Sequence, residues 1–224
     1  MADDYLSDRE QEEALRTWWR DNWRWIFGGI VLGVALLVGY FQFKDHRERQ
    51  GIAAAEQYAQ VRAAVQRNDL EAAQAALAPI EADHDSSVYA NQARLLVAKL
   101  QADAGNFDGA AALLREVADK SKDEEMAAVA KLRLARVLIQ QGKHDDAIAL
   151  LNVQKLGAFA AVAREIRGDA NVAKGDAAAA RAEYAAALAA DDAQIDRSML
   201  ELKLQEAGGS RTAAAADANA QVEP

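Results

Sequence analysis

Residues 130–154 read AKLRLARVLIQQGKHDDAIALLNVQ, and two other segments align with them. These are ARLLVAKLQADAGNFDGAAALLREVA at 93–118 and AREIRGDANVAKGDAAAARAEYAAAL at 163–188. Each has a stretch with helical periodicity, a glycine, and a second helical stretch. The three glycines lie 37 and 33 residues apart. Because one hairpin of this size cannot bury its own apolar face, the repeat predicts a stack of helical hairpins.

Small residues recur at fixed distances from each glycine, seven positions before it and five after it. Tetratricopeptide-like hairpins need such residues where two helices approach closely, and the glycine suits the left-handed end of the first helix. A larger side chain, Leu114, Leu151 or Tyr184, follows four positions after the second small residue. The predicted repeat-packing residues are Ala98, Gly105, Ala110, Ala135, Gly142, Ala147, Gly168, Gly175 and Ala180.

The pattern extends in both directions. Residues 49–65 and 70–80 predict an earlier hairpin, with a turn at 67–69 that lacks glycine. Residues 195–206 predict a closing helix that covers the last open face. In the third hairpin, Arg167 and Asn171 stand where the second has Leu134 and Leu138, so its outer face is expected to be polar. Since alanine buries little surface, Leu134, Leu138 and Leu151 are expected to carry much of the stability.

The sequence IFGGIVLGVALLVGYFQF, residues 26–43, is free of charge and as a helix would span about 27 Å. It predicts a membrane span, because all four tryptophans cluster before it and aromatic residues prefer the bilayer boundary. In the tail before it, the amphipathic pattern predicts a helix in the interface and a turn at Asp21 and Asn22. The predicted anchor residues are Trp18, Trp19, Trp23, Trp25, Ile26, Leu32, Leu36, Leu37, Tyr40 and Phe43.

The anchor is expected to remain uncleaved, because four arginines face seven acids in the 25 residues before it, unlike a signal peptide. Lysine and arginine balance across the span and do not decide its orientation. A short tail before a first span favours a cytoplasmic N-terminus and a translocated C-terminal domain. The predicted divisions are a tail with an amphipathic helix (1–22), a transmembrane helix (23–43), an all-α tetratricopeptide-like domain (44–206) and a disordered tail (207–224).

Composition argues against several function classes. From residue 44 onward there are 22 basic and 28 acidic residues, so nucleic-acid binding is not expected. The chain has no cysteine, and its histidines, His46, His84 and His144, are scattered. We therefore expect no catalytic residue, no metal site and no cofactor. The hypothesis is an interaction protein whose first-helix faces form a partner-binding groove of Leu95, Lys99, Leu132, Arg136, Ile139 and Asp169.

Four motifs, LRLARV (132–137), IRGD (166–169), KGDAAAAR (174–181) and MLELKL (199–204), follow the one-span anchor in order. In this arrangement the chain resembles the bacterial YfgM family over nearly its whole length, excluding the C-terminal tail. The resemblance implies an inner-membrane ancillary subunit of the SecYEG translocon, with its repeat domain in the periplasm. It also implies association with PpiD, a membrane-anchored periplasmic chaperone, and a link to an envelope-stress response regulator.

Alternatives stay open at this point. The acidic tail or a repeat groove could sequester the stress response regulator, but a periplasmic groove cannot hold a cytoplasmic partner. The stack could instead be a scaffold for another envelope machine, such as cytochrome maturation or cell division. An enzyme is a further class, for which the sequence offers no residues.

Overall fold

The computed structural model describes residues 8–190 and 195–208, and every regular element in those ranges is helical, which confirms the all-α class. The chain divides into two compact units, residues 1–52 and 53–224. The predicted C-terminal tail lies outside the described residues from 209 onward. The helices are α1 (Asp8–Gln66), α2 (Leu70–His84), α3 (Val88–Asp103), α4 (Phe107–Lys120), α5 (Glu124–Gln140), α6 (His144–Leu150), the short 3-10 helices η1 (Val153–Lys155) and η2 (Gly157–Phe159), α7 (Ala160–Lys174), α8 (Ala177–Ala189) and α9 (Arg197–Glu206).

Helix α1 continues through Asp21 and Asn22, so the turn predicted there is wrong. Asn22 and, one turn earlier, Thr17 bond back to the helix backbone instead. The Asn22 amide donates to the Trp18 carbonyl at 2.9 Å, and the Thr17 hydroxyl donates to the Glu13 carbonyl at 2.9 Å. Such bonds to the carbonyl four residues earlier satisfy the side chain without interrupting the helix.

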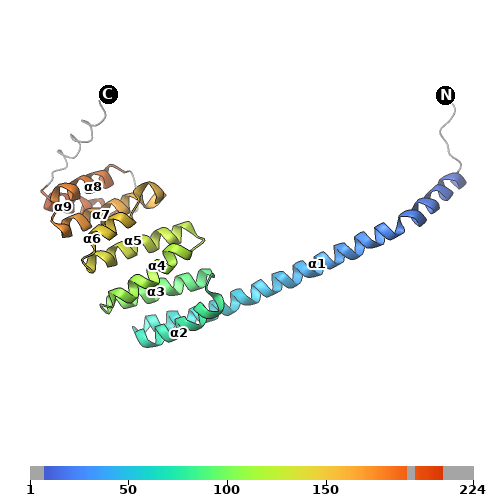
Figure 1. Ribbon diagram of the computed structural model, residues 1–224, viewed down its shortest axis with the longest axis horizontal. Helices are drawn as coiled ribbons and strands as arrows, with labels where there is room; N and C mark the ends of the chain where they lie inside the picture. The colour runs from blue at the N-terminus through green and yellow to red at the C-terminus, as the bar shows by residue number, and fades with distance from the viewer. Residues whose placement is uncertain (1–7, 191–194, 209–224) are drawn as a thin grey trace, which may run out of the picture. The chain divides into compact units, whose positions relative to one another are not determined.

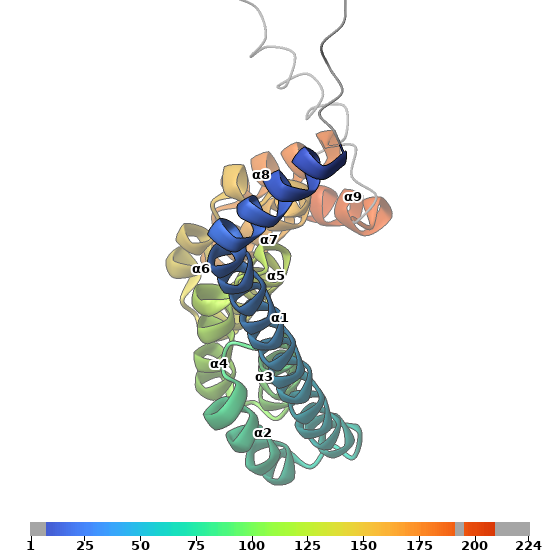
Figure 2. The same ribbon diagram turned by 90° about the vertical axis from the view of Figure 1, so that its right-hand side faces the viewer.

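The second unit is a stack of antiparallel helical hairpins, which Figure 1 shows as a ladder from α2 to α8. Figure 2 shows α4 and α6 toward one side of the stack and α3 and α5 toward the other. The hairpins are α3–α4, α5–α6 and α7–α8, preceded by the end of α1 with α2 and followed by α9. The predicted order of hairpins is therefore the observed one.

Polar side chains and left-handed residues set the helix ends. At the start of most helices a side-chain oxygen accepts a hydrogen bond from a backbone N–H of the first turn, which would otherwise lack a partner. The capping residues are Asp69, Ser87, Asn106, Asp123, Asp176 and Asp196. Gly105, Gly142 and Gly175 have φ of +79°, +74° and +87°. In the hairpin without glycine, Asn68 takes this role at φ +54°, since asparagine tolerates the left-handed region.

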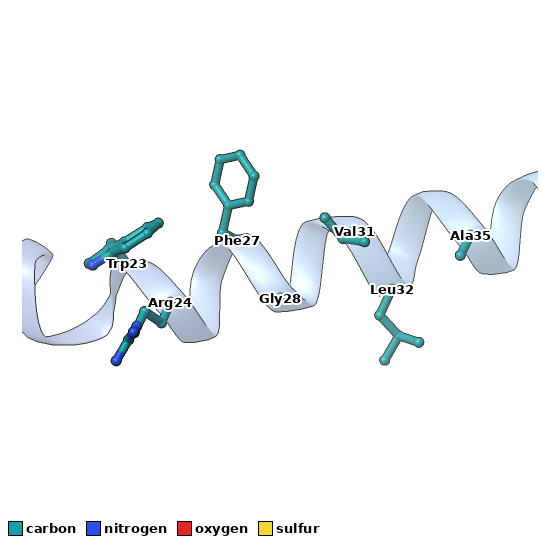
Figure 3. Close-up of a pocket in the computed structure, with 7 residues that line it drawn as sticks. All are labelled: Trp23, Arg24, Phe27, Gly28, Val31, Leu32 and Ala35. Atoms are coloured by element: carbon teal, nitrogen blue, oxygen red, sulfur yellow. The ribbon is translucent and has the colours of Figure 1, made fainter.

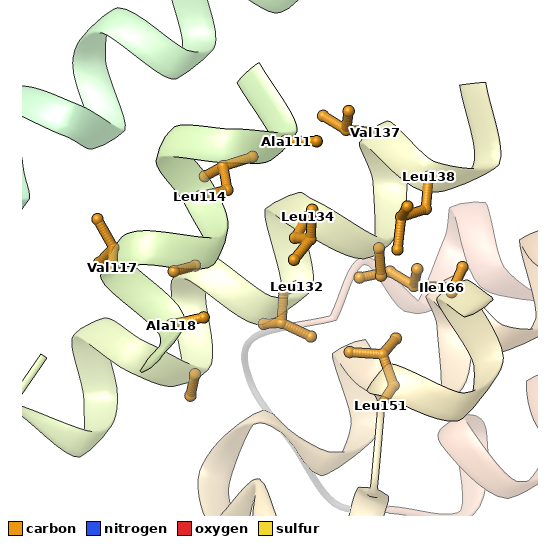
Figure 4. Close-up of a cluster of buried hydrophobic side chains, with 14 of the residues drawn as sticks. Ala111, Leu114, Val117, Ala118, Leu132, Leu134, Val137, Leu138, Leu151 and Ile166 are labelled. Atoms are coloured by element: carbon orange, nitrogen blue, oxygen red, sulfur yellow. The ribbon is translucent and has the colours of Figure 1, made fainter. Parts of the chain in front are cut away.

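The core consists of three clusters in chain order. The first joins the end of α1 to α2 and α3 around Val61, Leu77 and Ile80. The second, shown in part in Figure 4, runs from α3 to α7 and contains Leu134, Leu138 and Leu151, which are 0–3% exposed. The third joins α8 and α9 to the start of α7 and is centred on Tyr184, Leu200 and Leu204. Successive hairpins thus share buried surface, as a repeat stack requires.

The third hairpin replaces apolar contacts by polar ones. The Arg167 guanidinium bonds Glu183 at 2.7 Å and donates to the Leu151 carbonyl at 3.2 Å, while Asn171 is buried. Helix α9 then packs on α8 and buries Leu200 and Leu204. The closing helix predicted for residues 195–206 is therefore present and covers the apolar face left open by α8. The expectation of a polar outer face on the third hairpin is wrong, because Arg167 is turned toward the preceding hairpin and Asn171 is buried.

Candidate partner-binding site

Among the described residues, α1 is the one helix long and apolar enough to cross a membrane by length and composition. Its most apolar window has a mean hydropathy of 2.0, and none of that window is buried. Figure 3 shows Trp23, Phe27 and Val31 on one side of the helix, with Arg24 and Leu32 on the other. The predicted anchor residues are exposed apart from half-buried Ile26: Trp18, Trp19, Trp23, Trp25, Leu32, Leu36, Leu37, Tyr40 and Phe43.

The predicted repeat-packing residues lie at two kinds of position. The turn glycines, Gly105, Gly142 and Gly175, are exposed and left-handed, whereas the other six are buried between helices: Ala98, Ala110, Ala135, Ala147, Gly168 and Ala180. Gly168 shows the closest approach. A Cβ atom placed there would lie 2.2 Å from Cε1 of Tyr184, the large residue of the same hairpin. Only a residue without a side chain leaves room for this ring.

The predicted groove residues do not all reach solvent. Leu95 and Leu132 lie in the core, 9% and 5% exposed, while Ile139 is half-buried against it. Lys99 and Arg136 are exposed. Lys99 pairs with Asp103 on the next turn of α3. The side chains available to a partner on this face are therefore chiefly cationic, because the leucines are buried in the core.

Asp169, the sixth predicted groove residue, belongs to a polar cluster between α7, α8 and α9. The Lys203 Nζ bonds Glu165 at 2.7 Å and both Asp169 oxygens at 2.9 Å, and the Tyr184 hydroxyl donates to Asp169 at 2.8 Å. Burial acts to lower the pKa of Lys203, but the bonds to Asp169 and Glu165 outweigh it and raise this pKa. Burial, followed by the bond to Asp169, raises the pKa of Tyr184. The cluster holds α9 against the third hairpin.

Sequence reasoning missed a second polar cluster, around Arg94. Its side chain is 1% exposed and pairs with Glu81 at 2.9 Å, with Glu116 at 3.2 Å and with Asp85. It also donates to the carbonyl of Asp85 and to Asn91. The sequence did contain a signal for the burial of Arg94. This residue lies one turn before the small residue Ala98 and therefore on the inner face of α3.

Metal chemistry has no candidate in the described part of the chain. Residues 11–190 and 195–208 contain no group of three or more histidine, cysteine or carboxylate side chains that could hold an ion. His46 shares a hydrogen bond of 2.9 Å with Gln50, four residues along the exposed α1. Within these ranges, no histidine forms a hydrogen bond or an ion pair with a predicted groove residue.

The hairpin stack and the apolar helix together define a class, a membrane-anchored helical-repeat protein. The family model of the tetratricopeptide repeat-like domain matches residues 16–209. A protein of Haemophilus influenzae called an ancillary SecYEG translocon subunit is 31% identical over 171 residues, covering 76% of this chain and 83% of that protein. Proteins of the same name from Escherichia coli K12 and Neisseria gonorrhoeae are each 28% identical and are covered over 96% and 82% of their lengths, or 89% and 76% of this chain. The chain belongs to the family of ancillary SecYEG translocon subunits.

Proposed function

We propose that the chain is a non-enzymatic ancillary subunit of the SecYEG translocon, anchored in the bacterial inner membrane. Residues 23–43 cross the bilayer, the tail 1–22 stays in the cytoplasm, and the repeat domain of residues 44–206 stands in the periplasm. The name shared by the relatives supports the association with SecYEG. The single observation that carries the proposal is an apolar, uncovered helix on the same chain as a hairpin stack, an architecture made for binding proteins.

The repeat domain would link the translocon to a PpiD-like membrane-anchored periplasmic chaperone and so assist the biogenesis of secreted or outer-membrane proteins. The exposed cations Lys99 and Arg136 make the predicted groove a candidate surface for such a partner. The regulator hypothesis is confined to the tail, because a cytoplasmic regulator cannot reach a periplasmic groove.

Site-specific photo-crosslinking in intact membranes tests the proposal. A crosslinking residue at Leu36 in the span should capture translocon subunits, and one at Arg136 should capture the chaperone. Arg115 on α4 is exposed and has no ion pair in the described residues, so it is a matched position away from the groove. Failure to capture any translocon component from several span positions would contradict the proposed association.

Topology has a separate test. The chain contains no cysteine, so single substitutions introduce a unique thiol without background. Lys155→Cys should react in intact spheroplasts with a thiol reagent that does not cross membranes, whereas Glu12→Cys should react only after lysis. The reverse pattern would place the repeat domain in the cytoplasm.

The groove assignment is tested by the double substitution Arg136→Ala and Ile139→Ala. We expect lower recovery of the chaperone, with helix content by far-UV circular dichroism close to that of the unaltered chain. Ile139 is half-buried, so the single substitution Arg136→Ala is the cleaner arm. Unchanged recovery with both variants would remove the groove from the proposal.

A further inference from the structure

The left-handed turn residues give the hairpins a common register. Counting back six residues from Asn68, Gly105 and Gly142 leads to Arg62, Lys99 and Arg136. All three side chains are exposed, and each stands at the same place on the first helix of its hairpin. We call these three residues the cationic row. This row is positively charged although the chain as a whole carries a net charge of −9.

A second row accompanies the first one. Three residues before each turn residue stand Val65, Ala102 and Ile139, which are all half-buried. We call these three the apolar row. Residues three apart lie on the same face of a helix, so each apolar side chain neighbours the cation of its own hairpin. The surface thus repeats one pattern, a positive charge beside a partly exposed apolar group, on three successive hairpins.

The charges of the cationic row are largely unused. Arg62 and Arg136 make no ion pair in the described residues, and Lys99 pairs with Asp103 in an exposed bridge. Such bridges contribute little and exchange readily. A side chain four residues further along a helix lies beside each cation of the row. At these positions stand Gln66, Asp103 and Gln140, of which only Asp103 is acidic. Within their own helices, the three cations therefore have a single carboxylate among their neighbours four residues on.

The row ends at the α7–α8 hairpin. Six residues before Gly175 stands Asp169, which reverses the charge and already accepts hydrogen bonds from Lys203 of α9 and from Tyr184. A ligand that follows the cationic row therefore meets a neutralised cluster at α7. The binding surface is limited to the three hairpins that precede α7.

We propose that these two rows bind extended polypeptide segments in which acidic side chains alternate with apolar ones. The inference rests on the proposed function, because it takes the stack as a protein-binding surface. Each pair of one cation and one apolar residue comes from a different helix. A ligand that touches all three pairs must therefore run across the helices, as an extended chain can. Its carboxylates meet the cations and its apolar side chains meet the apolar row. A phospholipid headgroup surface would match the charges but would leave the apolar row without a partner.

Fluorescence anisotropy with the full chain in nanodiscs of zwitterionic lipid tests the proposal. The probe is a labelled peptide that alternates glutamate with valine, compared with peptides that alternate lysine with valine and glutamate with serine. We expect the first to bind and the other two to bind markedly more weakly. Added salt should weaken binding, since exposed charge pairs are screened. Equal binding of the glutamate–valine and lysine–valine peptides would overturn the proposal.

The variant that removes the row is Arg62→Gln, Lys99→Gln and Arg136→Gln together. We expect about tenfold weaker binding of the glutamate–valine peptide, because each exposed charge pair contributes modestly. The matched control is Arg115→Gln, Lys122→Gln and Lys155→Gln, which changes the net charge equally at exposed positions outside the row. The control should bind like the unaltered chain. Equal weakening in both triple variants would mean that net charge alone attracts the peptide, and the row would be rejected.

The outcomes separate this inference from the proposed function. If translocon subunits crosslink to the span but the peptides are not distinguished, only the acidic-segment inference fails. If the glutamate–valine peptide binds selectively and no translocon subunit is captured, the proposed association fails and the binding surface remains.

Discussion

Arg94 holds three helices together from a buried position. Glu81 comes from α2, Glu116 from α4 and Arg94 itself from α3, with Asp85 just after α2. Its guanidinium offers five donors in a plane, and carboxylates on several sides accept them. Burying a charge is costly unless it is paired in this way. Removing the cation leaves Glu81 without its ion pair. By contrast, Lys120 stays paired with Asp85 at 3.8 Å and with Glu116 at 3.6 Å.

Replacing Arg94 by methionine should lower the free energy of unfolding by about 2 kcal/mol, because it removes charged hydrogen bonds of a buried side chain to carboxylates that are themselves partly exposed. Urea unfolding of the full chain in detergent, followed by circular dichroism, measures the change. Lys99→Met removes a cation from an exposed pair and should cost less than about 1 kcal/mol. Equal losses in the two variants would contradict the role assigned to Arg94.

Gly168 is the residue at which one methyl group matters most directly. Gly168→Ala should destabilise the chain by about 1–3 kcal/mol, because the new Cβ would overlap the Tyr184 ring. Thermal unfolding is the measurement. The double variant Gly168→Ala with Tyr184→Leu should cost less than the sum of the two single variants, since the smaller side chain relieves the overlap. Additive costs would show that the two residues do not compete for space.

At the scale of elements, α9 depends on polar contacts at both ends as well as on two leucines. Arg197 donates to the carbonyls of Leu188 and Ala190 near its start, and Arg181 donates to the Ala207 carbonyl at its end. Between them Lys203 reaches Glu165 and Asp169. A short helix with few buried side chains is thereby fixed to the third hairpin, and its attachment should respond to the charge state of these groups.

The attachment of α9 should weaken in alkali. The pKa values of Lys203 and Tyr184 are both raised in the folded chain above their ordinary values of 10.5 and 10.0. Their contribution is therefore complete below about pH 10 and is lost as the pH rises further. Hydrogen exchange of α9 amides across this range should show the loss. Lys203→Gln should loosen α9 already at neutral pH, whereas Lys174→Gln, which breaks an exposed pair with Asp145, should not.

At the scale of the whole molecule, apolar side chains are buried in the stack of hairpins and exposed on the anchor helix. The stack hides its leucines between hairpins, while the apolar residues of α1 are uncovered over more than four turns. In the hydrocarbon core of a bilayer such a helix exposes no apolar surface to water, and its backbone groups are satisfied by its own hydrogen bonds. The chain is thus expected to need a membrane or detergent for solubility, although its repeat unit has a core of its own.

Leu36→Arg should impair membrane insertion, since a charged residue near the centre of a span costs roughly 2.5–3.5 kcal/mol. The fraction of chain that resists extraction from membranes by alkaline carbonate measures this effect. Ile52→Arg lies outside the apolar run at a position that is 61% exposed, and it should be extracted no more than the unaltered chain. Complete resistance of the Leu36→Arg variant would contradict the spanning assignment.

Local pattern was sufficient for much of this architecture. The spacing of Gly105, Gly142 and Gly175 predicted the hairpins and their turns, because a left-handed helix end depends on the residue at that position. The apolar run at 26–43 predicted the span, because hydropathy and length are properties of a single helix. The wrong turn at Asp21 and Asn22 arose because turn-forming residues also bond back to a helix, and the sequence does not distinguish the two.

The amino-acid sequence by itself determined where the helices of the repeat hairpins turn and which of their faces are apolar, since caps, glycines and periodicity act over a few residues. Only the tertiary structure decided which side chains meet across helices. Arg94 finds carboxylates 13 and 22 residues away, Lys203 finds Asp169 34 residues away, and Leu95 and Leu132 become core and not groove. The physical reason is that such contacts depend on how the hairpins pack, and packing combines many weak short-range interactions between residues far apart in the chain.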